Sequence, residues 1–176
     1  MIGVKRRGGR VIHGDGLQRV WTPLVLKPLA YYDADKGVTL NGSTVSSWAD
    51  SSGSGDANRT VVQATQAAQP LYTAKDSDFN GHGSLTFSGA QQMRSGTWST
   101  QPVAATHYLV GKFTQVSGAH VAVGCIDGAH HVCYFADSNI HLLNNIDITA
   151  AYSYGLSVLA FVVNSTTSAV YVNNSK

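Results

Sequence analysis

The chain contains no glutamate, so its ten acidic residues are all aspartate. Charged residues of both signs make up only 12% of the 176 positions. Glutamate is a helix former that β-rich chains can do without. Abundant Gly, Ser, Thr and Asn suit short strands joined by tight turns better than charged helices. The composition therefore predicts an all-β protein, and the length suits one main domain.

Long apolar runs, an export signal and a cysteine framework are also missing. No apolar run approaches the ~20 residues of a membrane span. Gly8-Gly9-Arg10 stands where the apolar part of a secretion signal would begin, so Sec-dependent export is not indicated. The two cysteines, Cys125 and Cys133, are too few for a disulfide framework. We expect no membrane partner.

Positive charge is concentrated at the start of the sequence. Residues 1–27 carry six basic residues against one acid, a net charge of +5, and the remainder carries −3. Residues 1–28 have no strand or helix period, so they form either a disordered tail or an extended arm that orders against a neighbouring subunit. We predict the arm. Its assembly residues are Lys5, Arg6, Arg7, Arg10, Val11, Ile12 and Trp21.

Several motifs follow one another between residues 31 and 89. An aromatic-D-A-D segment at 32–35 is followed by a W-x-D-x-S-G-x-G loop at 48–55, a Q-P at 69–70 and an F-x-G at 79–81. Their order and spacing resemble the laminin-G-like, concanavalin-A-like jelly-roll domains of phage virions and bacterial surface proteins. The resemblance implies a two-sheet antiparallel jelly-roll sandwich over residues 29–176, preceded by the arm of residues 1–28.

The resemblance also implies structural roles for the motif residues, which are Asp33, Asp35, Trp48, Asp50, Gly53, Gly55, Gln69 and Pro70. Trp48 is expected to pack in the sandwich, and Asp50 to accept hydrogen bonds from amides around Gly53 and Gly55. Asp33 and Asp35 superficially match a calcium loop, but the set of ligands is incomplete. We expect them to bind turn amides instead.

Strands are predicted at 29–33, at 45–48 and 61–67 around the loop, and then at 84–88, 106–113, 116–126, 139–143, 157–163 and 169–173, with a turn at 40–43. The residues predicted to be buried are Leu85, Phe87, Leu109, Leu159, Phe161 and Val163. His107 and Lys112 are predicted to face solvent. Family members continue for several strands beyond the equivalent of Lys176, so we expect either a fragment or strands supplied from elsewhere.

A hairpin is predicted around Asp127-Gly128. With the turn centred on Ala129, Cys125 and Cys133 lie opposite each other, which permits a disulfide. Two buried thiols are the favoured alternative, because no export signal is indicated. His130 and His131 suggest zinc, but adjacent strand residues face opposite sides and cannot easily share one ion. We expect no metal and no other cofactor.

Catalysis is not expected. Glycan-cleaving relatives of this fold use paired carboxylates on one strand, whereas Asp76 and Asp78 stand on a loop, and no G-x-S-x-G turn is present. We predict a non-enzymatic virion structural protein of a bacteriophage, located in the virion and assembled in the host cytoplasm.

Its expected partners are other copies of itself and other virion proteins. A nucleic-acid partner is not expected, because the basic arm lacks interleaved aromatics. The alternative function is a carbohydrate-binding module for cell-surface glycan, with Trp98 and Tyr152 as the stacking aromatics.

Overall fold

The computed structural model describes residues 23–98, 104–114, 120–123, 132–136, 139–143, 147–151, 155–163 and 167–173. Within these ranges the regular elements are twelve strands and four short 3-10 helices, and all strand pairings are antiparallel. The predicted all-β class with almost no helix is confirmed. None of the helices in these ranges is long and apolar enough to cross a membrane.

The elements fall into two compact units. Unit 1 comprises Met1–Asp76 and His82–Trp98, and unit 2 comprises Ser77–Gly81 and Ser99–Lys176. The elements of unit 1 are η1 (Pro23–Leu26), β1 (Val38–Asn41), β2 (Thr44–Trp48), η2 (Ala57–Arg59), β3 (Val61–Val62), η3 (Gln66–Ala68), β4 (Leu71–Asp76) and β5 (His82–Thr86). Those of unit 2 are η4 (Ser77–Phe79), β6 (Ala105–Phe113), β7 (His120–Val123), β8 (Val132–Ala136), β9 (Asn139–Leu143), β10 (Asp147–Ala151), β11 (Gly155–Val163) and β12 (Ala169–Val172).

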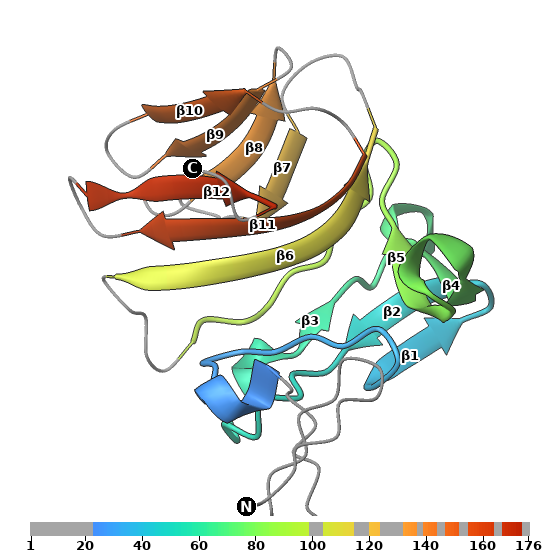
Figure 1. Cartoon of the computed structure of the whole chain (residues 1–176). Helices are drawn as coiled ribbons and strands as arrows, with labels where there is room; N and C mark the ends of the chain where they lie inside the picture. The colour runs from blue at the N-terminus through green and yellow to red at the C-terminus, as the bar shows by residue number, and fades with distance from the viewer. Residues whose placement is uncertain are drawn as a thin grey trace, which may run out of the picture. The chain divides into compact units, whose positions relative to one another are not determined.

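Unit 1 contains one sheet in the order β1-β2-β4-β5, with β3 paired to β2 (Figure 1). β1 and β2 form a hairpin whose loop is Gly42-Ser43, and Gly42 has a φ of +67°. Glycine reaches this left-handed region at no steric cost, which is why it opens two-residue hairpin loops. The turn predicted at 40–43 is confirmed.

Residues 29–33 do not form a strand, so this prediction was wrong. The Tyr31 N–H donates to Asp50 Oδ1 at 2.8 Å, and the Tyr31 carbonyl accepts from the Ser51 N–H at 2.7 Å. A backbone N–H that donates to a carboxylate does not need a hydrogen-bond acceptor on a neighbouring strand. The segment is therefore held by the loop after β2, and the first strand is β1.

The second strand around the loop is shorter than predicted. Only β3 (Val61–Val62) of the segment 61–67 pairs with β2, and η3 follows it. The chain leaves η3 at Gln69, before Pro70, as a proline ring requires. Pro70 begins the return path to the sheet, since its carbonyl accepts from the N–H of the fully buried Val45 at 2.9 Å.

Unit 2 contains a four-stranded sheet, β10-β9-β8-β7, and a three-stranded sheet, β12-β11-β6 (Figure 1). β12 also approaches β9 and β10, so the two sheets are neighbours. β6 and β11 pair along their whole length, from Gly155 opposite Phe113 to Val163 opposite Ala105. β6, β9, β11 and β12 match their predicted segments to within two residues at each end.

One face of the three-stranded sheet forms the core of unit 2. Leu159, Phe161 and Val163 are at most 1% exposed, which confirms three of the six burial predictions. Leu109, opposite Leu159, is half-buried. His107 lies opposite Phe161 on this same face, so its predicted solvent orientation was wrong. His107 and Lys112 are five positions apart and must face opposite sides of a regular strand.

The burial predicted for β5 was also wrong in part. Phe87 is 51% exposed, so its predicted burial was wrong, whereas Leu85 is partly buried. The buried residue of this strand is Ser84, whose hydroxyl donates to Asp76 Oδ2 at 2.6 Å. β5 ends at Thr86, so the strand alternation that predicted a buried Phe87 no longer applies there.

The register of β7 and β8 bears on the two cysteines. Cys133 lies opposite Val123, so it does not have Cys125 as its direct partner, contrary to the expected register. A turn centred on Ala129 is thus not supported by the pairing. Cys125, His130, His131 and the turn itself lie outside the described residues.

Candidate functional site

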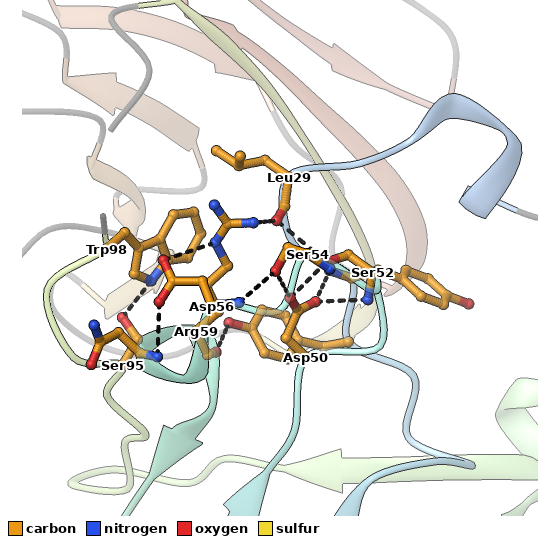
Figure 2. A network of polar contacts seen from close by, with 11 residues as sticks. Leu29, Asp50, Ser52, Ser54, Asp56, Arg59, Ser95 and Trp98 are labelled. Carbon is orange, nitrogen blue, oxygen red and sulfur yellow. Dashed lines mark hydrogen bonds and ion pairs between the residues drawn. The ribbon is translucent and has the colours of Figure 1, made fainter. Parts of the chain in front are cut away.

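The loop between β2 and η2 is organised around the carboxylate of Asp50 (Figure 2). Asp50 Oδ1 accepts from the N–H groups of Tyr31 (2.8 Å) and Ser52 (2.9 Å). Asp50 Oδ2 accepts from the hydroxyls of Ser52 (2.6 Å) and Ser54 (2.9 Å). Gly53 and Gly55 have φ values of +78° and +74°, which let the chain curl around this carboxylate.

The predicted role of Asp50 is confirmed, but with different donors. The Ser52 N–H bond is the expected Asx turn, whereas the other three bonds come from Tyr31 and two hydroxyls. Burial raises the pKa of Asp50, but the hydrogen bonds from Ser52, Tyr31 and Ser54 outweigh it, so the pKa lies below its ordinary value. Each of these bonds favours the charged carboxylate.

A chain of hydrogen bonds continues from this loop into η2. Ser54 Oγ accepts from the Asp56 N–H at 3.3 Å, and Asp56 Oδ1 caps η2 by accepting from the Asn58 N–H at 3.0 Å. Ser, Asp and similar residues cap helices because a short side chain reaches these unpaired amides. The loop and the helix are therefore one hydrogen-bonded structure.

Arg59 is the buried charge of the loop. It is 4% exposed, and its Nε lies 3.5 Å from Asp56 Oδ2, an ion-pair contact without good hydrogen-bond geometry. One guanidinium N–H donates to the Leu29 carbonyl, which ties residues 29–33 to the loop. The Arg59 carbonyl accepts from the Tyr32 hydroxyl. A buried guanidinium needs such partners, because an unpaired buried charge is strongly destabilising.

The ring of Trp98 packs against the Arg59 guanidinium. The Arg59 Cζ is 5.3 Å from the centroid of the Trp98 ring, and Trp98 Nε1 donates to Ser95 Oγ at 3.0 Å. The guanidinium lies over the ring, as in a cation–π contact. Trp98 is half-buried, so one of the two predicted glycan-stacking aromatics packs within the loop. Tyr152 lies outside the described residues.

Trp48, which was predicted to pack in the sandwich, packs against Tyr32. Its ring lies 5.5 Å from that of Tyr32 at an interplanar angle of 57°, and its Nε1 donates to the Asp33 carbonyl at 3.0 Å. Such tilted pairs are favourable for aromatic rings. Burial, followed by the nearby Asp50 charge, raises the pKa of Tyr32 to about 12, although Arg59 lowers it. Tyr32 therefore stays neutral and keeps its hydroxyl proton for the Arg59 carbonyl.

The D-A-D segment is a turn held to β5. Asp33 Oδ1 accepts from the Asp35 N–H at 3.0 Å, and Asp35 Oδ1 accepts from the Gly83 N–H at 2.6 Å. His82 Nδ1 lies 2.6 Å from Asp35 Oδ2. The Gly83 amide bond, followed by the His82 contact, holds the pKa of Asp35 below its ordinary value. Both aspartates bind backbone amides as predicted, but the Asp35 partner is distant in sequence.

Gly83 has no room for a side chain where this turn meets β5. A Cβ at this position would lie 2.8 Å from the Ala34 carbonyl oxygen and 2.9 Å from Tyr72 Oη. Tyr72 Oη itself donates to the Ala34 carbonyl at 3.1 Å.

Among the described residues no group of three or more His, Cys, Asp or Glu side chains could hold a metal ion.

Gln69 is a buried polar residue between η3 and β4. It is 1% exposed, its Oε1 accepts from Thr44 Oγ1 at 2.7 Å, and its Nε2 donates to the Gln63 carbonyl at 2.7 Å. A buried amide must satisfy both its ends. The Q-P motif is therefore structural, because Gln69 joins β2 to the segment before η3.

Asp76 is the last residue of β4 and Asp78 lies in η4, so their predicted position on a loop was wrong. The two carboxylates have separate structural partners. Asp76 accepts from Ser84, and Asp78 Oδ2 lies 2.7 Å from Lys112 Nζ. The assembly residues predicted in the arm, from Lys5 to Trp21, lie outside the described residues.

Sequence reasoning missed Arg59, Ser52, Ser54 and His82. A signal for Arg59 exists, since few charged residues occur in this chain and Arg59 follows Asp56 by three positions, but no local pattern points from His82 to Asp35.

Comparison of the chain with protein-family models, with curated proteins and with solved structures gave no match.

Proposed function

We propose that the chain is a non-enzymatic structural protein of a bacteriophage virion, a capsid-decoration, tail or fibre component. In this proposal the described sheets belong to a laminin-G-like, concanavalin-A-like jelly-roll sandwich that binds protein neighbours. The antiparallel all-β structure and the self-contained W-x-D-x-S-G-x-G loop support it. The N-terminal arm would bind other copies of the chain.

One observation carries the protein-binding part of the proposal. On the face of the three-stranded sheet opposite the core, four large side chains form an exposed group, here called the outer patch: Tyr108 (68%), Val110 (61%), Leu156 (54%) and Val158 (48%). Val110 and Val158 are direct cross-strand partners. Contiguous exposed apolar side chains of this kind mark interaction surfaces.

The use of the aspartates supports a non-enzymatic role. In the described ranges, carboxylate oxygens of Asp33, Asp35, Asp50, Asp56, Asp76 and Asp78 contact the chain's own amides, hydroxyls or Lys112. A general acid or nucleophile must instead reach a substrate atom. These carboxylates hold the fold together.

The experiment is mass spectrometry of particles purified from cells that carry this gene, with the chain tagged. We expect the chain to copurify with the particles, and Val110→Asp to reduce its incorporation by placing a charge in the outer patch. The matched control is Val62→Asp, which adds the same charge at a residue 50% exposed on β3. A chain found only free in the cell, with no particle association, would contradict the proposal.

Carbohydrate binding is the second candidate. Its support is the family resemblance, and Trp98 is the one described residue proposed for stacking. Because the Trp98 ring contacts Arg59 and its N–H contacts Ser95, we rank this function below protein binding. A glycan-array signal that is lost in Trp98→Ala, with the far-ultraviolet spectrum unchanged, would reverse that order.

A further inference from the structure

Asn-Gly pairs occur twice in the sequence, at Asn41-Gly42 and at Asn80-Gly81. Glycine after asparagine leaves the following peptide nitrogen unshielded, because glycine has no Cβ. The two pairs have the same chemistry in the unfolded chain, so any difference between them in the folded protein comes from the structure.

The Asn41-Gly42 pair is restrained. Asn41 is the last residue of β1 and is paired with Thr44, whose Oγ1 lies 2.8 Å from the Asn41 carbonyl oxygen. The Asn41 side-chain amide lies 3.4 Å from Gln69 Oε1. These contacts oppose rotation of the peptide between Asn41 and Gly42, and they oppose rotation of the Asn41 side-chain amide toward that peptide's nitrogen.

The Asn80-Gly81 pair lacks these restraints. Both residues are exposed and follow η4 in a turn, and both have positive φ values, +55° and +79°. No atom lies within 4 Å of the position that a Cβ would take at Gly81 or at Gly42, so both peptide nitrogens are sterically open and the difference between the pairs lies in the contacts of the asparagine. Within the described part of the chain, no hydrogen bond ties down the Asn80 side-chain amide.

We propose that Asn80 is a site of spontaneous deamidation, and that the fold protects Asn41 from the same reaction. The Gly81 peptide nitrogen attacks Cγ of Asn80, a new N–C bond forms, and the side-chain amide leaves as ammonia with the proton from the Gly81 N–H. Water then opens the resulting succinimide at either carbonyl. The products are aspartate, or isoaspartate with one more backbone carbon in the turn.

The modification adds a negative charge close to an existing ion pair. Asp78, two residues before Asn80, contacts Lys112 on β6 at 2.7 Å. A second carboxylate in this turn would compete for the same ammonium group. The reaction therefore changes both the charge and the backbone of the turn that contacts β6.

The test is incubation of the full-length protein at mildly alkaline pH, followed by peptide mapping with a fragmentation method that separates isoaspartate from aspartate. We expect Asn80 to convert several-fold faster than Asn41 in the folded protein, and the two rates to converge in denaturant. Thr44→Val should accelerate the deamidation of Asn41 and leave the deamidation rate of Asn80 unchanged.

Asn80→Asp serves as the standard for the aspartate product. Equal rates at the two sites in the folded protein, or faster conversion of Asn41, would overturn the proposal. Because the comparison is made within one molecule, it stands even where Thr44→Val fails to fold. Its outcome is also independent of whether the chain is found in a virion.

Discussion

Among the described residues, the buried side chains of unit 1 are largely polar, whereas those of unit 2 are largely aliphatic and aromatic. In the described part of unit 1 they include Arg59, Gln69 and Ser84 beside Val45 and Pro70. In the described part of unit 2 they are Leu159, Phe161, Val163, Ala169 and Val170, with Ser157. Unit 1 therefore depends on hydrogen-bond geometry, and unit 2 on the removal of apolar surface from water.

This difference has a practical meaning for sequence change. A sheet core accepts one apolar residue for another of similar volume at low cost. A polar network does not, because removing one partner leaves the other buried and unsatisfied. The loop around Asp50 and Arg59 should tolerate fewer substitutions than its polar, glycine-rich composition indicates.

The largest effect is expected in the apolar core. Phe161→Ala should lower the free energy of unfolding by about 3–5 kcal/mol, because it removes buried apolar area and leaves a cavity. Chemical denaturation measures the loss, and hydrogen exchange of β6 and β11 localises it. The matched control is Val158→Ala on the same strand but the exposed face, which should cost no more than about 0.5 kcal/mol. Similar losses for both variants would contradict the assignment of the two faces.

The next effect tests the polar network. Arg59→Met keeps much of the apolar stem but removes the charge, which deletes the ion-pair contact to Asp56 and the donor to the Leu29 carbonyl. Breaking a buried pair in this way costs about 3 kcal/mol or more. Denaturation should show the loss, and hydrogen exchange should show faster opening of residues 29–33.

Arg94→Met is the control for this variant, because Arg94 is exposed and its guanidinium contacts Gln92. Its expected cost is no more than about 0.5 kcal/mol. An Arg59→Met variant as stable as this control would show that the network contributes nothing beyond packing.

Asp50→Asn should cost about 1–2 kcal/mol at neutral pH, because hydrogen bonds to a charged acceptor are stronger than those to an amide. The pKa of Asp50 is lowered in the fold. Its contribution is therefore fully present above the ordinary aspartate pKa of about 3.9 and is lost as the pH falls through the lower folded pKa.

The stability of the wild type should thus fall more steeply in acid than that of Asp50→Asn. Denaturation at a series of pH values between neutral and strongly acid measures the difference. If the free energy of unfolding changed with pH in the same way for both proteins, the assignment of charge-dependent hydrogen bonds to Asp50 would be wrong.

The smallest effect is expected for Asp78→Asn. Asp78 and Lys112 form an ion pair whose side chains are 46% and 48% exposed, and exposed pairs contribute about 0–1 kcal/mol. The loss should shrink further in high salt. A cost as large as that of Asp50→Asn would show that exposure does not separate the two carboxylates.

Local structure was predictable where neighbouring residues decide it. The Gly42 turn, the curl at Gly53 and Gly55, and the stop before Pro70 follow from the backbone preferences of single residues. The strand alternation of β11 placed Leu159, Phe161 and Val163 on one face, because side chains alternate along any strand. The same rule predicted that Phe87 would be buried. This prediction was wrong, because the rule cannot say where a strand ends.

The sequence by itself determined the all-β class and which loop would bend around Asp50, because both depend on residues that are close together in the chain. Tertiary structure alone decided that Arg59 would be buried against Leu29, and that Asp35 would bind Gly83 and His82. These contacts join residues 30, 48 and 47 positions apart. Hydrogen bonds act only within about 3 Å, and the path of the whole chain sets which distant groups come that close.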